Sequence, residues 1–508
     1  MPTPRDPPHG SVDLVGAGPG DPGLMTRLGA DSLARAGAVV YDHLVHPALL
    51  DLAPPTADRI LAGKRAGKCV LRQPEINDLL VTLAKQGKHV VRLKGGDPLV
   101  FGRGSEEAER LAAEGIPFRI IPGVTAALGA SAYAGLPLTH RGDSSAVAFV
   151  TGHDEPGDSA SRVDWAALAR FPGTLVIYMG VGRLRSICSA LIEGGKPRAT
   201  PAALVHSATL PTQKTIVANL VDLPDAVERS GIGPPAVLVV GDVARHHQAI
   251  GWFEARPLFG TTIVVTRPAE EASRSGEVLE SLGAEVILAP TIEILPPEDF
   301  GPVDSSLARM GEFDWLVFTS ANGVRHFLDR MESTGQDARA LGRVKIAAIG
   351  PATAEALRSY RLRADLVPDS NRSEFLAETL IERVRGGRVL LARADRGREF
   401  LKAELERVAI VEEVVAYRNA DAVSLPPGVA ERIAGGSVDW ITATSSAIVK
   451  RLHALLPDEA RAKVGRGVKL ASISPITSDA ARVLGWDVAV EAEEYTWNGV
   501  VRAILASL

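Results

Sequence analysis

Short runs of β-branched and other apolar residues alternate with amphipathic segments along the first 245 residues. A strand rich in Val and Ile is typically followed by a glycine-rich turn and then by a stretch with helical periodicity. The clearest helical stretches are residues 27–36 and 75–86. The predicted strands are residues 12–15, 38–41, 89–93, 118–121, 146–150, 174–178 and 236–240. Strands that alternate with helices predict βαβ units and a mostly parallel sheet.

This alternation stops at residues 244–261 and resumes with the apolar run TIVVT at residues 262–266. We therefore place a domain boundary near residue 256. Trp252 and Phe253 lie in the intervening linker, and their size favours packing on a neighbouring element. The expected organisation is one domain over 11–245, a linker over 246–260 and a second domain over 261–508.

The second half contains a weak internal repeat. VFTSANGV at 317–324 is echoed by ITATSSAIV at 441–449, and VKIAAIGPATAEA at 344–356 by VKLASISPITSDA at 468–480. Generic strand–turn–helix units can resemble one another by chance. Because two successive motifs recur in the same order, the pattern instead predicts two similar α/β lobes with a cleft between them.

Composition narrows the class of protein. The 508 residues include 46% apolar and 23% charged residues, which excludes disorder, collagen and coiled coil as descriptions of the whole chain. The net charge of −5 does not favour wrapping of nucleic acid, so a polyanionic ligand needs a local basic patch. Two cysteines, the absence of a long apolar run and a proline-rich start predict a cytoplasmic protein without membrane segments.

The glycine-rich turn GAGPGDP at 16–22 raises the hypothesis that the protein is a nicotinamide-dependent dehydrogenase. A dinucleotide fingerprint needs a third glycine where this chain has Asp21, and Pro19 lacks an amide that could face phosphate. The turn therefore argues against a nicotinamide site. In LKGGDPLVFGRG at 93–104, by contrast, Gly95 and Gly96 permit close approach of a ligand to the backbone, and Asp97 supplies a carboxylate.

Residues 59–72 hold five basic side chains and no acidic one. They form either a solvated charged segment, the commoner explanation for basic residues alone, or the local basic patch that a polyanionic ligand needs. The histidines at 43, 46, 140 and 153 lack the spacing of a zinc set, and Cys69 has no cysteine close by, so no metal is expected. The five basic residues are Arg59, Lys64, Arg65, Lys68 and Arg72.

The stretch 12–245 resembles the tetrapyrrole methylases, most closely the uroporphyrinogen-III C-methyltransferases. The motifs GAGPGDP, YDHLV, GKR, VVRLKGGDPLVFGRG, PGVTAA, AYAGLPLTHR, VTGH, TLVIYMG and PPAVLVVGDV occur in the order of that family. The resemblance implies two α/β domains, S-adenosylmethionine folded in the cleft between them, and a homodimer formed through this half.

The same resemblance implies site residues. Asp42 and Lys64 match the proton acceptor and donor, Arg103 matches a catalytic position, and Glu106 and Arg141 match substrate-binding positions. Ala208 stands where the family often has a glycine. The residues expected to hold S-adenosylmethionine are Pro19, Gly95, Gly96, Asp97, Val100, Thr125, Ala126, Met179 and Ala208.

The second half has no catalytic signature, and its residues alone suggest a cofactor-free α/β cleft for an anionic ligand. VVTRP, DWLVFTSANGV, AAIGPATAEAL, VEEVVAYR, TSSAIV and YTWNGVV make it similar to the uroporphyrinogen-III synthases. That resemblance implies two lobes joined by a two-stranded linker, with an inserted lobe at about 292–417. Tyr417 matches the family's proposed general acid, while Ser474 replaces a family glycine. The expected substrate-binding residues are Arg267, Ser320, Ser445, Ser446 and Thr477.

Together these resemblances predict a methylase two-domain α/β fold followed by a two-lobed α/β synthase-like fold. The expected enzyme cyclises hydroxymethylbilane to uroporphyrinogen III and methylates it to precorrin-2, in the sirohaem or cobalamin branch. Because no further module is recognised, we expect the chain to stop at the methylated product. The alternative is an active methyltransferase whose C-terminal half only binds or presents the tetrapyrrole.

Overall fold

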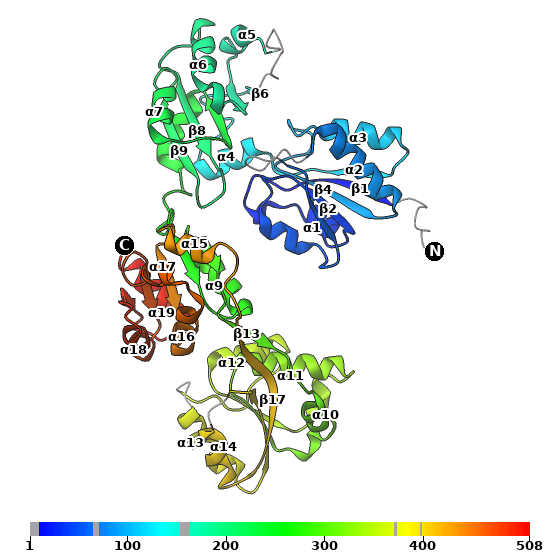
Figure 1. Cartoon of the computed structure of the whole chain (residues 1–508), viewed down its shortest axis with the longest axis vertical. Helices are drawn as coiled ribbons and strands as arrows, with labels where there is room; N and C mark the ends of the chain where they lie inside the picture. Colours follow the sequence, from blue (N-terminus) through cyan, green and yellow to red (C-terminus); the bar gives the residue numbers. More distant parts are fainter. Residues whose placement is uncertain (1–9, 64–70, 153–162, 370–372, 397–398) are drawn as a thin grey trace. The chain divides into compact units, whose positions relative to one another are not determined.

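The computed structural model describes residues 10–63, 71–152, 163–369, 373–396 and 399–508. The chain forms two compact units (Figure 1). The first comprises Met1–Gly260 with Leu282–Glu285, and the second comprises Thr261–Ser281 with Val286–Leu508.

The first unit begins with a fully parallel five-stranded sheet, as predicted. Its strands lie in the order β3-β2-β4-β1-β5. β1 and β4 are buried along nearly their whole length, although β1 contains Asp13 and β4 contains Arg92 and Lys94. The strands are β1 (Ser11–Gly16), β2 (Ala38–Tyr41), β3 (Asp58–Leu61), β4 (His89–Lys94) and β5 (Phe118–Ile121), and the helices are α1 (Arg27–Leu33), α2 (Gln73–Lys85) and α3 (Gly104–Ala113).

The second sheet of this unit is mixed, so the expectation of mostly parallel strands is wrong here. Only β6 and β7 are parallel, because β8 and β9 are joined by a short turn instead of a helical crossover. The order is β6-β7-β10-β8-β9. The elements are α4 (Ala126–Ala134), β6 (Val147–Thr151), α5 (Trp165–Ala169), β7 (Thr174–Tyr178), α6 (Leu184–Glu193), β8 (Pro201–His206), β9 (Lys214–Asn219), α7 (Leu223–Ser230) and β10 (Ala236–Val240).

The linker packs against this unit, as the two aromatic residues predict. It begins at the end of the 3₁₀-helix η4 (Asp242–His246) and contains the short helix α8 (His247–Ile250). The indole N–H of Trp252 donates a hydrogen bond to the carbonyl of Ala132 over 2.9 Å. Phe253 is buried, with its ring centroid 4.7 Å from that of Tyr133. The end of α4 is therefore covered by the linker.

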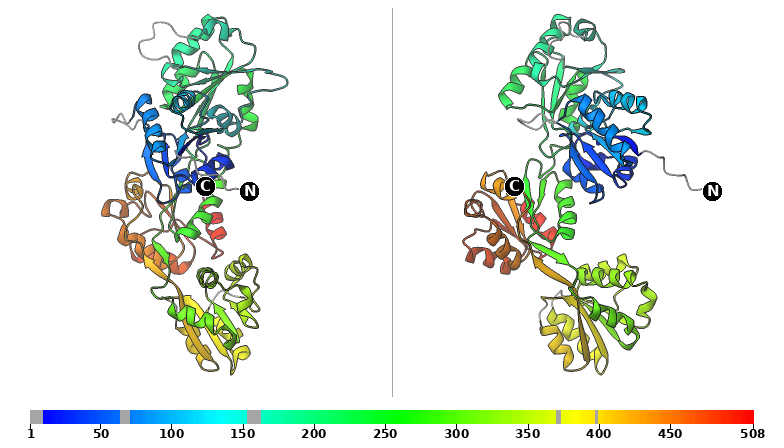
Figure 2. Two further views of the ribbon diagram at one scale, coloured as in Figure 1. Left: turned by 90° about the vertical axis from the view of Figure 1, so that its right-hand side faces the viewer. Right: turned by 45° about the vertical axis from the view of Figure 1, so that its right-hand side comes forward.

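The second unit contains two lobes, each built on a five-stranded sheet. One sheet has the order β12-β11-β18-β19-β20 and the other β13-β17-β16-β14-β15. The chain leaves the first lobe through β13 and returns through the long strand β17, and these two strands pair antiparallel (Figures 1 and 2). The strands are β11 (Thr262–Val265), β12 (Glu285–Leu288), β13 (Ile292–Leu295), β14 (Trp315–Phe318), β15 (Lys345–Ala348), β16 (Arg388–Ala394), β17 (Ile410–Asp421), β18 (Trp440–Ala443), β19 (Lys469–Ser472) and β20 (Val490–Glu491).

The internal repeat is confirmed. The order β14-α11-β15-α12 in one lobe corresponds to β18-α16-β19-α18 in the other. The helices of this unit are α9 (Ala269–Ser281), α10 (Gly301–Ala308), α11 (Ala321–Ser333), α12 (Pro351–Ser359), α13 (Ser373–Val384), α14 (Phe400–Glu406), α15 (Val429–Ala434), α16 (Ser446–Leu455), α17 (Asp458–Arg461), α18 (Pro475–Val483) and α19 (Trp497–Leu505).

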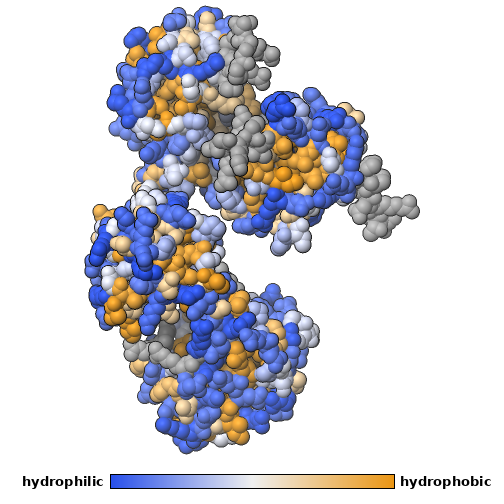
Figure 3. All heavy atoms as spheres, viewed as in Figure 1, coloured by the Kyte–Doolittle hydropathy of each residue, from blue (hydrophilic) through white to orange (hydrophobic). Residues whose placement is uncertain are grey.

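Hydrophilic residues cover much of the face seen in Figure 3, with hydrophobic residues between them. Among the helices that the structure describes, none has both the length and the apolar character needed to cross a membrane.

Candidate active sites

Three loops at the carboxyl edge of the parallel sheet are tied together through glycine backbone. The N–H of Gly96 donates to the carbonyl of Gly18 over 2.7 Å, which joins the loops after β1 and β4. A Cβ on Gly123, in the loop after β5, would lie 2.2 Å from the carbonyl oxygen of Gly96. Gly123 therefore has to be a glycine for the three loops to meet. Ligands of open α/β sheets bind at this edge.

Asp97 fixes two of these loops to each other. Its carboxylate accepts a hydrogen bond from the N–H of Leu99 at 2.8 Å and another from the N–H of Gly123 at 3.1 Å. Val100 and Ala126 pack against the same apolar cluster. Asp97 thus organises the loop that contains Gly95 and Gly96, and its remaining acceptor capacity is available to a ligand.

The end of β7 meets the beginning of α4. The hydroxyl of Tyr178 lies 2.7 Å from the hydroxyl of Thr125 and accepts a hydrogen bond from the N–H of Ala127 at 3.1 Å. Met179 follows with a positive φ of 55° and a side chain that is 50% exposed. A long apolar side chain held outward in this strained conformation suits contact with a ligand.

The loop after β8 reaches the loop after β1. The hydroxyl of Thr209 accepts a hydrogen bond from the N–H of Asp21 over 2.9 Å, and the neighbouring Ala208 is buried. Pro19 packs on α4 so closely that a Cβ on Gly129 would lie 2.5 Å from its ring. All nine positions expected to hold S-adenosylmethionine therefore lie on segments that contact one another within the first unit.

A cavity of about 380 Å³ lies beside these loops. Asp42, the expected proton acceptor, lines it at the end of β2, together with Arg103. Lys64, the expected proton donor, lies outside the described residues. The cavity is also lined by Arg72, Arg92 and Lys94, so one carboxylate faces several cations.

Two of the expected substrate-binding residues, Glu106 and Arg141, do not line this cavity. Glu106 holds Arg103 through two hydrogen bonds of 2.8 and 2.7 Å, so it orients this guanidinium at the rim of the cavity. Arg141 is exposed on the turn between α4 and β6 and is not among the residues that line the cavity.

Arg92, Lys94 and Glu107 form a buried charged cluster beneath Asp42. Glu107 Oε1 lies 3.1 Å from Arg92 Nε and 2.9 Å from Lys94 Nζ, and Arg92 Nη2 lies 2.5 Å from Asp42 Oδ1. Burial lowers the pKa of Lys94, and the charge of Arg92 lowers it further. Sequence reasoning missed this cluster. Its signal is a pair of charges two residues apart in an otherwise apolar strand, which places both on one face.

Replacing Glu107 with glutamine should destabilise the first unit by about 3–5 kcal/mol, because two buried cations lose their shared counter-ion. Denaturant titration of the full chain measures this loss. The neighbouring Glu106→Gln, which breaks only an exposed pair, should cost less than about 1 kcal/mol. Equal losses in the two variants would contradict the importance assigned to the buried cluster.

In the inserted lobe, Tyr417 and Ser320 lie together. The ring of Tyr417 is 6% exposed and belongs to the core, whereas its hydroxyl lies 3.0 Å from the hydroxyl of Ser320. Ser320 caps α11 by accepting a hydrogen bond from the N–H of Gly323. The imidazole of His326 stacks at 5.6 Å from the phenol ring. A phenol held in this way presents its hydroxyl at one fixed place.

The other expected residues lie in the first lobe, after β11, β18 and β19. Ser445 caps α16 with φ and ψ of −163° and 158°, matching the −164° and 157° of Ser320. Ser446 is the first residue of α16, and the buried Thr477 lies in α18. Arg267 donates a hydrogen bond to Ser275 over 3.0 Å and lies over the ring of Trp497.

Ser474 replaces a glycine without strain. Its φ of −163° is extended, as is the φ of −176° at the corresponding Gly350 in the inserted lobe. Because this turn does not use a positive φ, a serine can adopt it. The Ser474 hydroxyl lies 3.1 Å from that of Thr477.

Comparison with known proteins assigns each half to a family. Residues 11–224 match the model of the tetrapyrrole (corrin/porphyrin) methylases, and residues 273–502 match that of uroporphyrinogen-III synthase HemD. The porphyrin biosynthesis protein HemD of Ruminiclostridium josui is 38% identical over 452 residues, which cover 89% of this chain and 90% of that protein. The sirohaem synthase of Azotobacter vinelandii is 51% identical over 247 residues, 49% of this chain and 53% of its own length.

Solved structures match the two halves separately. Uroporphyrin-III C-methyltransferase of Thermus thermophilus, solved with S-adenosylhomocysteine, is 41% identical and covers 46% of this chain and 99% of its own, with a TM-score of 0.41. A uroporphyrinogen III synthase from the same organism is 19% identical and covers 49% and 98%, with a TM-score of 0.35. From the family models and the relative that spans both halves, the chain belongs to the family of tetrapyrrole biosynthesis proteins in which a methylase domain is followed by a uroporphyrinogen-III synthase domain.

Proposed function

We propose that this chain is a bifunctional enzyme that catalyses two consecutive steps. Its C-terminal half cyclises hydroxymethylbilane to uroporphyrinogen III, and its N-terminal half methylates that product at C2 and C7 to give precorrin-2. The observation that carries the methylation step is the cavity in which Asp42 faces Arg72, Arg92, Lys94 and Arg103. A substrate with eight carboxylates needs such cations, and methylation of a pyrrole carbon needs a base.

The residues beside this cavity fit S-adenosylmethionine. A Cβ built on Gly96 would meet the backbone of Ala126 at 3.7 Å and of Thr125 at 3.8 Å, which are ordinary contact distances, so no protein atom crowds this glycine. Exposed apolar side chains belong to the same segments, namely Leu99, Leu128 and Met179. Bare backbone with polar N–H and C=O groups beside apolar side chains matches a ligand that combines a planar base with charged groups.

When bound, S-adenosylmethionine supplies a methyl group activated on a sulfonium. The chain's own residues then have two tasks. Arg72 and Arg103, the exposed cations of the cavity, hold substrate carboxylates and orient the pyrrole ring, since correct placement accounts for much of the barrier in such transfers. The methylated ring carbon carries no hydrogen, so the positive charge left on the ring is neutralised by loss of a proton from a pyrrole nitrogen or a neighbouring bridging carbon. Asp42 accepts that proton, and Arg92 keeps its carboxylate in place.

Shortening Met179 to alanine should weaken binding of S-adenosylhomocysteine by about fivefold, the equivalent of about 1 kcal/mol for a half-exposed apolar side chain that the ligand covers. Isothermal titration calorimetry measures the change. Val217→Ala, on the edge strand β9, removes an exposed apolar group elsewhere and should leave affinity unchanged. Unaltered affinity in Met179→Ala would place the ligand elsewhere.

For cyclisation, the proposal rests on Tyr417. Hydroxymethylbilane must lose a hydroxyl group before its ring closes, and a phenol can donate the proton that makes water the leaving group. The 3.0 Å contact with Ser320 supports this role because it fixes the phenol hydroxyl at the end of β14. Backbone N–H groups and hydroxyls at the helix starts after β14, β18 and β19 are suited to the substrate carboxylates.

Supplying each half with its own substrate tests the proposal. Uroporphyrinogen III with S-adenosylmethionine should give a doubly methylated product, and hydroxymethylbilane alone should give uroporphyrinogen III in preference to the isomer that forms without catalysis. If the first reaction occurs and the second does not, the C-terminal half only binds or presents the tetrapyrrole.

A further inference from the structure

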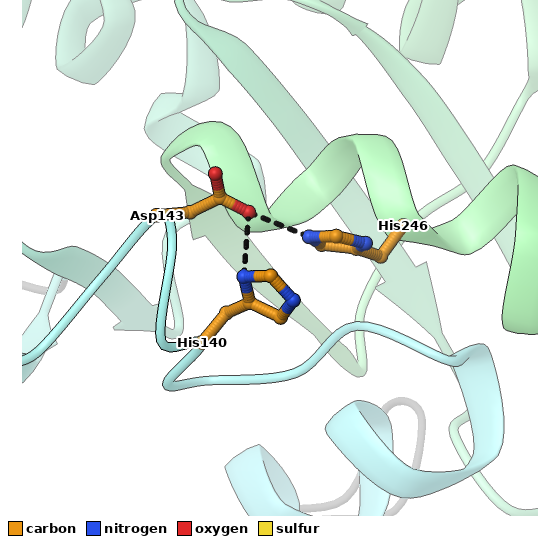
Figure 4. Close-up of side chains that lie close together, drawn as sticks. All are labelled: His140, Asp143 and His246. Carbon is orange, nitrogen blue, oxygen red and sulfur yellow. Dashed lines mark hydrogen bonds and ion pairs between the residues drawn. The ribbon is translucent and has the colours of Figure 1, made fainter.

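Two histidines and an aspartate outside the proposed active sites converge on one point (Figure 4). His140 and Asp143 lie on the turn between α4 and β6, and His246 is the last residue of η4. The turn is closed by a pair of backbone hydrogen bonds of 2.9 Å in which His140 and Ser144 exchange their N–H and C=O groups. These bonds hold His140 and Asp143 on the same small loop, so two of the three side chains are pre-organised.

The three side chains direct one atom each toward the others. Asp143 Oδ2 lies 3.0 Å from His140 Nδ1 and 2.6 Å from His246 Nε2. All three atoms lie within 4.8 Å of one another, and the imidazole centroids are 4.2 Å apart. Ligands of a tetrahedral zinc ion, at about 2.0–2.2 Å from the metal, are separated by about 3.3–3.6 Å. Side-chain shifts of less than about 1 Å would therefore create the required separation.

The hydrogen bonding of His140 supports a cation here. The N–H of Gly142 lies 3.2 Å from His140 Nδ1, and a metal ion at this nitrogen would take its single lone pair in place of that contact. The same nitrogen also faces the carboxylate oxygen of Asp143. The place between this nitrogen and the carboxylate therefore suits a positive charge, which is either a proton or a metal ion.

We propose that His140, Asp143 and His246 form a binding site for a divalent transition-metal ion of borderline softness, such as zinc or cobalt(II). Two imidazoles and one carboxylate favour such an ion over magnesium or calcium, which prefer oxygen ligands. The three side chains are partly exposed, which leaves the remaining coordination positions to water or to an external ligand.

A bound ion would tie the turn that contains Arg141 to η4. Arg141 follows His140 directly, so its position depends on how firmly this turn is held. The ion therefore orders a loop of the methylase half rather than acting on the transferred methyl group. Spacing along the chain does not reveal the set, because His246 lies 103 residues from Asp143.

Calorimetric titration of the full chain with zinc chloride tests the proposal. We expect saturable binding that weakens by at least about tenfold in Asp143→Asn and in His246→Gln, each of which preserves side-chain size. The exposed His43 serves as the control, and His43→Gln should bind zinc as the wild type does. Cobalt(II) should give visible absorption bands that change in the two ligand variants, and magnesium should not compete.

The zinc affinities of the wild type, Asp143→Asn and His246→Gln can be compared directly. Neither exchanged side chain is buried in the core, so both variants should fold. Saturating zinc should also raise the unfolding temperature of the wild type and not that of Asp143→Asn, since a ligand that binds only the folded state stabilises it. Equal zinc affinity in the wild type, Asp143→Asn and His246→Gln, or no saturable binding in the wild type, would overturn the assignment.

Discussion

Replacing Asp42 with asparagine should lower kcat for methylation of uroporphyrinogen III by about 10²–10⁴-fold, the range that a general base supplies. The amide preserves the size of the side chain and still reaches Arg92, so the cavity keeps its shape. Binding of the octa-carboxylate depends on the surrounding cations, and KM should therefore change much less than kcat. Stopped assays with radiolabelled S-adenosylmethionine measure both constants.

The matched control is Asp51→Asn, on the exposed partner of Arg59. It should leave kcat unchanged, and both variants should retain the wild-type rate of cyclisation, because that reaction is assigned to the other unit. If Asp42→Asn raises KM and leaves kcat intact, Asp42 positions the substrate cations and a different group removes the proton.

Replacing Tyr417 with phenylalanine should slow cyclisation of hydroxymethylbilane by about 10²–10⁴-fold, and by less if water substitutes for the phenol. The ring remains packed in the core of the inserted lobe, so the fold should survive. Ser320 retains the hydrogen bond from Gly323 and loses only its contact with the phenol. Methylation of supplied uroporphyrinogen III should be unchanged.

Tyr360 offers a matched control in the same lobe. Its hydroxyl donates a hydrogen bond to Asp329 over 2.6 Å, and burial raises its pKa, so Tyr360→Phe removes a bonded phenol of similar character. Only Tyr417→Phe should affect cyclisation. A full cyclisation rate in Tyr417→Phe would make this residue a packing tyrosine whose hydroxyl serves Ser320.

The sequence predicts the fold well where burial is uniform. Strands such as β1 and β4 are buried along nearly their whole length and contain short apolar runs. The repeat in the second unit is visible because Ser320 and Ser445 cap equivalent helices. In the second sheet, β10 is predicted but its antiparallel direction is not, and β8 and β9 are not predicted at all. β9 is an edge strand whose residues are mostly exposed or half-buried, so it lacks an apolar run.

The sequence predicts site residues only where these residues belong to a short local motif. The glycines and Asp97 follow directly after a strand, and their role in joining loops is a local property. The buried cluster of Glu107, Arg92 and Lys94 cannot be predicted from a local motif. Charged residues are almost never fully buried, and only the fold brings α3 under β4. The same applies to Ser320 and Tyr417, which are 97 positions apart along the chain.

Incubation of the full chain with hydroxymethylbilane, with and without S-adenosylmethionine, tests the central claim most directly. We expect uroporphyrinogen III without S-adenosylmethionine and precorrin-2 with it, as identified by mass spectrometry and absorption spectra. Recovery of only the non-enzymatic isomer in the first reaction, or of unmethylated uroporphyrinogen III in the second, would contradict the claim that one chain catalyses both steps.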